Sequence, residues 1–146
     1  MRWHGEDSQR RFAFDLSSYP AAMKKRFWRS YVDPAGQSHA EAAEVEMTLS
    51  DFAPPAPPIL VSTPVSAAGF AYLRAPSGWF GGWHPAPRRQ LLVVLRGALE
   101  GEWSDGSRIR MEPGDVILLE DTREPGHSTR VVSDEDVEAL VVALPE

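Results

Sequence analysis

The sequence contains no cysteine, and this absence excludes several kinds of chemistry together. Disulfides, thiolate nucleophiles and cysteine-ligated zinc sites all require that residue. A metal ion would have to be held by histidine, carboxylate, amide or water, and the chain has 4 histidines. Composition alone therefore identifies no particular cofactor, and a divalent metal held by these other donors stays open as an alternative.

The chain also lacks a long apolar run and an excess of positive charge. Its longest apolar stretch, residues 139–144, is far too short to cross a bilayer, and its first residues lack the apolar region of a signal peptide. The formal net charge of −6 argues against a broad nucleic-acid footprint. We therefore expect a cytoplasmic protein that binds neither membranes nor nucleic acid.

The 146 residues are enough for one domain with a single core. Residues 1–22 are polar and charged without a sustained period, whereas a strand pattern begins near Met23 and leads into an Asp-Pro-Ala-Gly turn. This predicts a loosely structured N-terminal extension (1–22) followed by a β-barrel domain (23–146). The stretch "PPAPP" (54–58) cannot donate to a sheet ladder, and we interpret it as a stiff segment that crosses the body.

From Ile59 onward, short strand patterns follow one another, separated by glycine, proline and aspartate. In the clearest hairpin, 98–115, Leu99, Gly101 and Trp103 share one face, and Asp105-Gly106 is predicted as a two-residue turn. Trp103 is expected in the core. Such spacing, with no convincing helix, favours an all-β antiparallel sandwich or barrel.

Residues 78–97 match the spacing of a known motif: glycine, five residues, His-x-His, three or four residues, Glu, six residues, Gly. Gly78, His84 and Gly97 keep their places, but Ala86 replaces the second histidine and Gln90 replaces the glutamate. Residues 114–127 follow a second motif less closely, because "EDTREPGH" looks like a lengthened turn that carries His127. These are the two motifs of the cupin superfamily, and the chain resembles a small single-domain cupin over residues 27–145.

The resemblance implies an antiparallel jelly-roll β-barrel, cupin-like, with little helix, and it implies a homodimer. A cupin's usual metal is held by three imidazoles and one carboxylate. This chain would offer His84, Gln90 and His127 to iron, manganese, nickel or zinc, unless an acid from "LLEDT" joins them. Because most of the usual donors are changed, we expect no obligatory metal.

The leading hypothesis is a pocket for a small organic ligand around His84, Gln90 and His127. Strand alternation places His84, Ala86 and Gln90 on the barrel-lining face, and His127 should enter from the facing strand. The two histidines are the candidate catalytic residues, one as general base and the other as general acid. The further candidate ligand-binding residues, chosen as aromatic or charged neighbours of these positions, are Trp79, Trp83, Arg89 and Glu120.

Two alternatives stay open. A divalent-metal-dependent cupin enzyme of the dioxygenase, isomerase or cyclase type would use His84, Gln90 and His127 as metal ligands. A non-catalytic structural or interaction barrel would instead be closed and filled near His84. One of Arg88 and Arg89 should pair with Glu120 or Asp121, or with a carboxylate of a ligand, and a structural salt bridge is the simpler interpretation. His39 is predicted to be a surface or turn residue.

Overall fold

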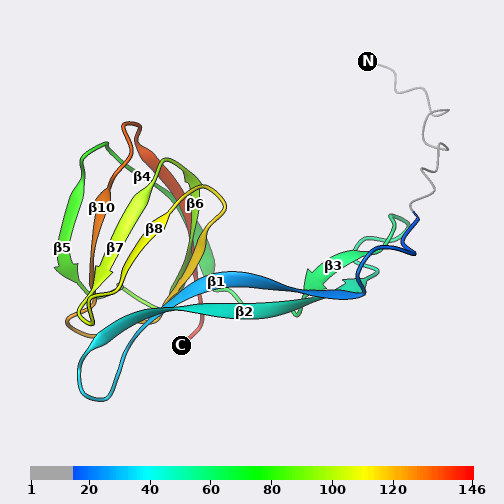
Figure 1. Ribbon diagram of the computed structural model, residues 1–146, viewed down its shortest axis with the longest axis horizontal. Coiled ribbons are helices and arrows are strands. Elements are labelled where there is room, and N and C mark those ends of the chain that lie inside the picture. The colour runs from blue at the N-terminus through cyan, green and yellow to red at the C-terminus, as the bar shows by residue number, and fades with distance from the viewer. Residues whose placement is uncertain (1–14) are drawn as a thin grey trace. The chain divides into compact units, whose positions relative to one another are not determined.

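The computed structural model describes residues 15–146, and these residues form strands and loops without any helix (Figure 1). No segment within them is therefore a helix of the length and apolarity needed to cross a membrane. The strands are β1 (Ala22–Val32), β2 (Ser38–Ser50), β3 (Ile59–Ser62), β4 (Gly69–Ala75), β5 (Phe80–His84), β6 (Gln90–Arg96), β7 (Leu99–Trp103), β8 (Arg108–Met111), β9 (Val116–Leu119), β10 (His127–Val131) and β11 (Val137–Ala143).

The chain divides into two compact units, and strands β1 and β2 run through both. In the smaller unit, which includes Glu46–Thr63, β3 pairs with the end of β2 in antiparallel register, with Ser50 opposite Ile59. The proline-rich stretch 54–58 lies in the loop that closes this hairpin. Its interpretation as a segment crossing the body is therefore wrong: proline cannot continue the ladder, so the chain turns there and returns beside β2.

The larger unit, Lys25–Val45 with Pro64–Glu146, contains two sheets. One has the order β2-β1-β9-β6-β11-β4, and the other has the order β5-β10-β7-β8, whose strands lie side by side in Figure 1. The pairs β6–β9, β6–β11, β4–β11, β5–β10, β7–β10 and β7–β8 are antiparallel, while β1 and β9 are parallel. The all-β antiparallel jelly-roll prediction is confirmed.

Both sheets of the larger unit contribute side chains to one hydrophobic core. Trp103 of β7 is buried together with Val94 of β6, Ile117 of β9 and Val137 of β11. Along β7 and β8 the burial alternates residue by residue, which is the period of a half-buried strand. The predicted inner face of this hairpin, Trp103 included, is confirmed.

The turn of the β7–β8 hairpin differs from the prediction. The Trp103 amide donates to the Ser107 carbonyl (3.0 Å) and the Gly106 amide donates to the Trp103 carbonyl (3.0 Å), so three residues, 104–106, form the loop. Gly106 has a φ of 89°, and no described non-glycine residue has a positive φ. A two-residue type I′ turn needs positive φ at both central positions, so the predicted two-residue Asp-Gly turn is wrong.

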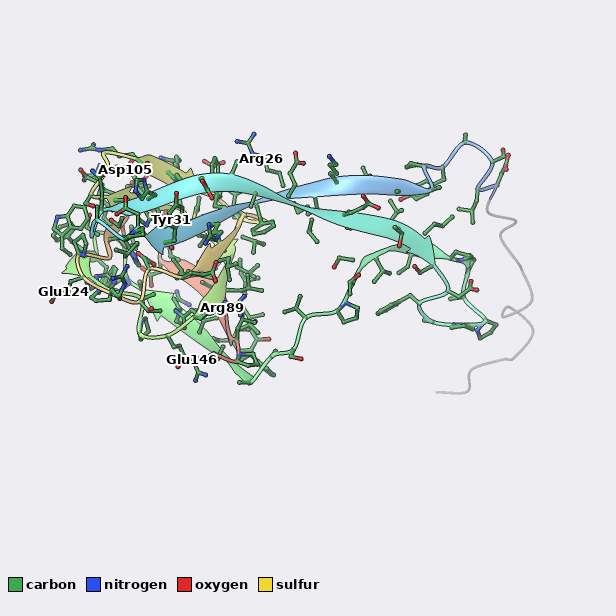
Figure 2. All side chains as sticks on the ribbon, turned by 90° about the horizontal axis from the view of Figure 1, so that it is seen from below. Arg26, Tyr31, Arg89, Asp105, Glu124 and Glu146 are labelled. Atoms are coloured by element: carbon green, nitrogen blue, oxygen red, sulfur yellow. The ribbon has the colours of Figure 1, made fainter. Side chains whose placement is uncertain are left out.

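His39 of β2 links the β7–β8 turn to the β1–β2 turn. The His39 ring lies between two carboxylates, with Nε2 2.6 Å from Asp33 Oδ2 and Nδ1 3.0 Å from Asp105 Oδ2, and it stacks on Tyr31 (Figure 2 labels Tyr31 and Asp105). Carboxylates only accept hydrogen bonds, so both contacts are satisfied together when the imidazole is protonated. The hydrogen bond to Asp33 accordingly raises the pKa of His39 above its ordinary value, with Asp105 adding to the effect against partial burial.

Candidate functional site

A cavity of about 340 Å³ lies within the larger unit. It brings together His84, Gln90 and His127, three of the residues that the sequence singled out, and Trp79 also lines it. Ala86, at the position of a missing imidazole, is buried in the same wall. The remaining lining residues are mostly apolar: Leu73, Arg74, Ala75, Pro76, Pro87, Leu92, Leu99, Leu119, Thr129 and Val137.

The two histidines come from adjacent strands of one sheet. His84 ends β5 and His127 begins β10, and the antiparallel register pairs them directly, with ring centroids 4.7 Å apart. The expectation that His127 enters from the facing strand is therefore wrong. The register of β10 against β5 shifts between His127 and Thr129, which is a bulge-like irregularity of the kind that re-aims side chains beside functional sites.

Gly126 lets the two strands approach each other at this point. Its φ is 65°, and a Cβ added there would overlap the carbonyl oxygen of His84 and lie 2.5 Å from Cα of Pro85. Glycine alone meets both demands without strain, because it has no Cβ and enters the left-handed region freely. The lengthened turn "EDTREPGH" thus ends on the residue that permits His127 to sit beside His84.

The hydrogen bonds of the rings determine their tautomers when both are neutral. Nδ1 of His84 lies 2.5 Å from the carbonyl oxygen of Gly82, and Nδ1 of His127 lies 2.5 Å from Oδ2 of Asp121. Carbonyl and carboxylate oxygens accept, so each Nδ1 must donate and each Nε2 keeps its lone pair. Within the described residues, neither Nε2 atom takes part in a hydrogen bond.

Asp121 is fully buried behind His127 and is held on its other side. The Ser30 hydroxyl donates to Asp121 Oδ1 (2.7 Å), and the Ala86 amide donates to the Asp121 carbonyl (3.0 Å). A buried carboxylate needs such partners, and Asp121 in turn orients the imidazole of His127. The sequence indicated Asp121 only as a salt-bridge or metal partner, so its contact with His127 was not predicted.

A signal for Asp121 was present in the alternation of β9. Ile117 and Leu119 are buried, and Asp121 continues that series two residues later, whereas Glu120 belongs to the opposite face. No sequence signal pointed to Ser30, which comes from β1, paired in parallel with β9 at Leu119.

Three predicted ligand-binding residues do not line the cavity. Trp83 is exposed and lines a separate pocket with Pro85, Glu124 and Pro125, because it alternates with His84 along β5. Arg89 and Glu120 pair with each other instead (Nε–Oε2 2.8 Å; Figure 2 labels Arg89), and Arg29 joins them (Nε–Oε1 2.7 Å). The structural salt bridge expected for one of Arg88 and Arg89 is confirmed, and Arg89 is the residue that makes it.

This ion-pair group also determines how Glu120 titrates. Partial burial raises the pKa of Glu120, but hydrogen bonds from Arg29 and Arg89 lower it by more, so the pKa lies below its ordinary value. The hydrogen bond to Glu120 correspondingly raises the pKa of Arg29 against the opposing effect of burial. Glu120 is therefore a structural anion.

The donor set does not fit a metal centre of the cupin type. Across residues 15–146 there is no group of three or more His, Asp or Glu side chains placed to hold a metal ion. The cavity supplies two imidazoles and the neutral amide of Gln90, while the nearest buried carboxylate, Asp121, is engaged by Nδ1 of His127 and by Ser30. Divalent metals of this class favour more donors, including a negative charge.

No protein-family model and no curated protein matches the sequence. Among solved structures, the chain is similar to a cupin 2 conserved barrel domain protein from Salinispora arenicola, with 22% identity and a TM-score of 0.43 over 68% of this chain and 76% of that one. It is also similar to a sugar phosphate isomerase of the cupin superfamily from Silicibacter pomeroyi, with 20% identity and a TM-score of 0.44 over 90% of this chain and 74% of that one. A cupin domain from Schizosaccharomyces pombe has 11% identity and a TM-score of 0.41, over 88% of each chain.

Proposed function

We propose that this barrel binds a small organic ligand in the cavity around His84, Gln90 and His127, and that the two histidines transfer protons to and from it without an obligatory metal. The observation that carries the proposal is the pair of adjacent imidazoles, each fixed through Nδ1 and each left with an unused Nε2 atom beside an apolar cavity. Two such atoms in one site can act as a base and an acid on a single ligand.

The cavity limits the size and character of the ligand. About 340 Å³ is at the lower end of small-molecule pockets, and at roughly 30 Å³ for a water-sized group it holds on the order of ten non-hydrogen atoms. Apolar side chains form most of the wall, while Gln90 can both donate and accept hydrogen bonds. A compact ligand with an apolar body and a few polar atoms fits this lining.

The surroundings of the two rings divide the roles between them. Nδ1 of His127 contacts the carboxylate of Asp121, whereas Nδ1 of His84 contacts only the neutral carbonyl of Gly82. We therefore assign the role of proton donor to His127, which contacts the carboxylate, and the role of proton acceptor to His84.

The alternatives predict different structures. A purely structural barrel predicts a filled interior near His84, which the cavity disfavours. A metal-dependent enzyme needs a donor set that the described residues do not provide. Elemental analysis of protein purified without chelator distinguishes a metal-dependent enzyme from the metal-free pocket proposed here. Stoichiometric metal that disappears in His84→Ala would refute the metal-free pocket.

The direct test is NMR-detected binding with matched histidine variants. The parent is screened against aliphatic hydroxy acids, aldoses and aromatic acids, with shifts of the His84 and His127 ring nitrogens as the signal. We expect His84→Gln and His127→Gln to lose binding of any hit at least tenfold, while His39→Gln, outside the cavity, binds like the parent. Equal binding by all three variants would refute the site.

The role of Asp121 has its own test. Asp121→Asn keeps the shape but removes the charge, so the side-chain amide can present either an oxygen or an N–H to Nδ1 of His127. Nitrogen-15 spectra of the ring should show the Nδ1-protonated tautomer in the parent and a mixed population in the variant. A parent that already shows the mixture would contradict the assigned geometry.

A further inference from the structure

One polar atom of the core has no protein partner. Among the described residues, Nε1 of Trp103 is the buried side-chain nitrogen or oxygen for which no hydrogen bond is found. Trp103 is 1% exposed, and its ring packs so closely over Gly101 that an added Cβ there would lie 2.5 Å from Cη2. An indole N–H only donates, and leaving it unpaired in the interior is unfavourable because the lost hydrogen bond to water is not replaced.

Trp103 also lines a small cavity of about 30 Å³. This volume exceeds what a single water-sized group requires. The cavity shares its wall with the ligand cavity, since Leu92, Leu99, Leu119, His127 and Thr129 line both. We call this space the inner subsite.

The inner subsite combines apolar walls with three polar side chains. The residues that line it include Trp103, whose indole N–H has no protein partner, Thr129, which carries a hydroxyl, and His127, whose ring centroid lies 5.7 Å from that of Trp103. A donor-only indole excludes an ammonium or other donor-only group as its partner. Its partner must be an acceptor, and the cavity is large enough for one oxygen atom.

We infer that the inner subsite binds one oxygen atom of the ligand, a carbonyl, carboxylate or hydroxyl oxygen, through a hydrogen bond donated by Nε1 of Trp103. This deepens the proposed function and rests on it: the ligand enters the larger cavity with an oxygen at its leading end. His127, the residue assigned as proton donor, lines the subsite in which this oxygen would bind. A water molecule is the other source of the same acceptor chemistry, and the test separates the two.

The test uses two probes of the same shape. Cyclohexanone carries a carbonyl oxygen, and methylenecyclohexane carries a methylene group in its place. Each of the 5 tryptophans contributes an indole N–H signal to the NMR spectrum, and the signal that disappears in Trp103→Phe belongs to Trp103. We expect cyclohexanone to shift the Trp103 signal downfield and to bind about threefold to tenfold more tightly than methylenecyclohexane, as one net hydrogen bond predicts.

A second variant protects the test against misfolding. Replacing Trp103 by benzothienylalanine keeps the bicyclic shape and removes the N–H, whereas Trp103→Phe also leaves a cavity. We expect the isosteric variant to bind both probes equally. A preference for cyclohexanone that survives in this variant would overturn the inference.

The outcomes distinguish this inference from the proposed function. If the probes shift His84 and His127 but leave the Trp103 indole unchanged, the pocket stands and the inner subsite is refuted. If water cross-relaxation with the Trp103 N–H persists at saturating cyclohexanone, the site is a structural water site only, and the inference also fails. If no probe reaches either histidine, the proposed function fails, and the inner subsite as a ligand site fails with it.

Discussion

Gly126→Ala should damage this protein more than an ordinary turn substitution does. Alanine at a φ of 65° costs about 1–2 kcal/mol, because the left-handed region crowds Cβ against the backbone. Here the new Cβ also meets the carbonyl of His84 and the Cα of Pro85, and backbone atoms cannot rotate away. Relief requires β10 to move from β5, which adds roughly 1–3 kcal/mol, as overpacking does. Together these effects lower the free energy of unfolding by about 2–5 kcal/mol.

Urea unfolding measures this effect, and the chain contains a matched control. Gly106 has a φ of 89°, but nothing lies within 4 Å of a Cβ added there, so Gly106→Ala carries the backbone cost alone. The difference between the two variants isolates the close approach of β10 to β5. Gly126→Ala should also weaken the contact between the His84 and His127 rings in NMR spectra. If Gly126→Ala is no less stable than Gly106→Ala, the proposed crowding beside His84 is wrong.

Three further predictions concern charge. The hydrogen bond to Asp33 raises the pKa of His39, so protonated His39 stabilises the fold fully below about pH 6.5, and this stabilisation is lost as the pH rises through the folded-state pKa. The urea midpoint of the parent should therefore rise between pH 8.5 and pH 5.5, and His39→Gln should make this rise smaller. An unchanged pH dependence in the variant would contradict the contact. Burial raises the pKa of Glu120, but hydrogen bonds from arginine lower it by more, so ionised Glu120 stabilises the fold above about pH 4.5, and this stabilisation is lost on acidification through the folded-state pKa. Glu120→Gln should therefore reduce the loss of stability that urea unfolding measures at acid pH. The same acid dependence in parent and variant would refute the role of Glu120 as an ion-pair anion. The double variant Ala86→His with Gln90→Glu restores three imidazoles and a carboxylate, so elemental analysis should find about one bound zinc or nickel per chain; none would mean that these positions do not converge.

The fold could be predicted because strand patterns depend on local information. Period-two alternation and the glycine, proline and aspartate between strands indicated an antiparallel barrel, and burial along β7 and β8 follows that alternation. The predictions failed in the loops, where the backbone conformation depends on several residues together. The loop 104–106 takes three residues because positive φ is confined to glycine, and the prolines at 54–58 close a hairpin.

The candidate site was predictable as a set of motif positions, but its geometry was not. Motif spacing identified His84, Gln90 and His127, and all three line the cavity. Spacing could not show that β10 is the neighbour of β5, because strand order depends on contacts between distant segments. For the same reason, the buried contact of Asp121 with His127 became visible only once β9, β10 and β1 were placed together.

The buried carboxylate of Asp121 could support either a metal-binding histidine or a proton-donating histidine, and the residues that line the cavity favour the second role. A carboxylate on Nδ1 is the usual way to orient a metal-binding histidine, because it fixes the tautomer and makes Nε2 a better donor. It serves a proton donor equally well, because it stabilises the imidazolium form. With Ala86 and Gln90 in the wall, the described residues provide no ligating carboxylate for a metal ion in this cavity, which supports the proposed role of His127 as the donor of a proton. An oxygen acceptor in the inner subsite would then lie beside that proton, which is the arrangement that favours proton transfer to the ligand.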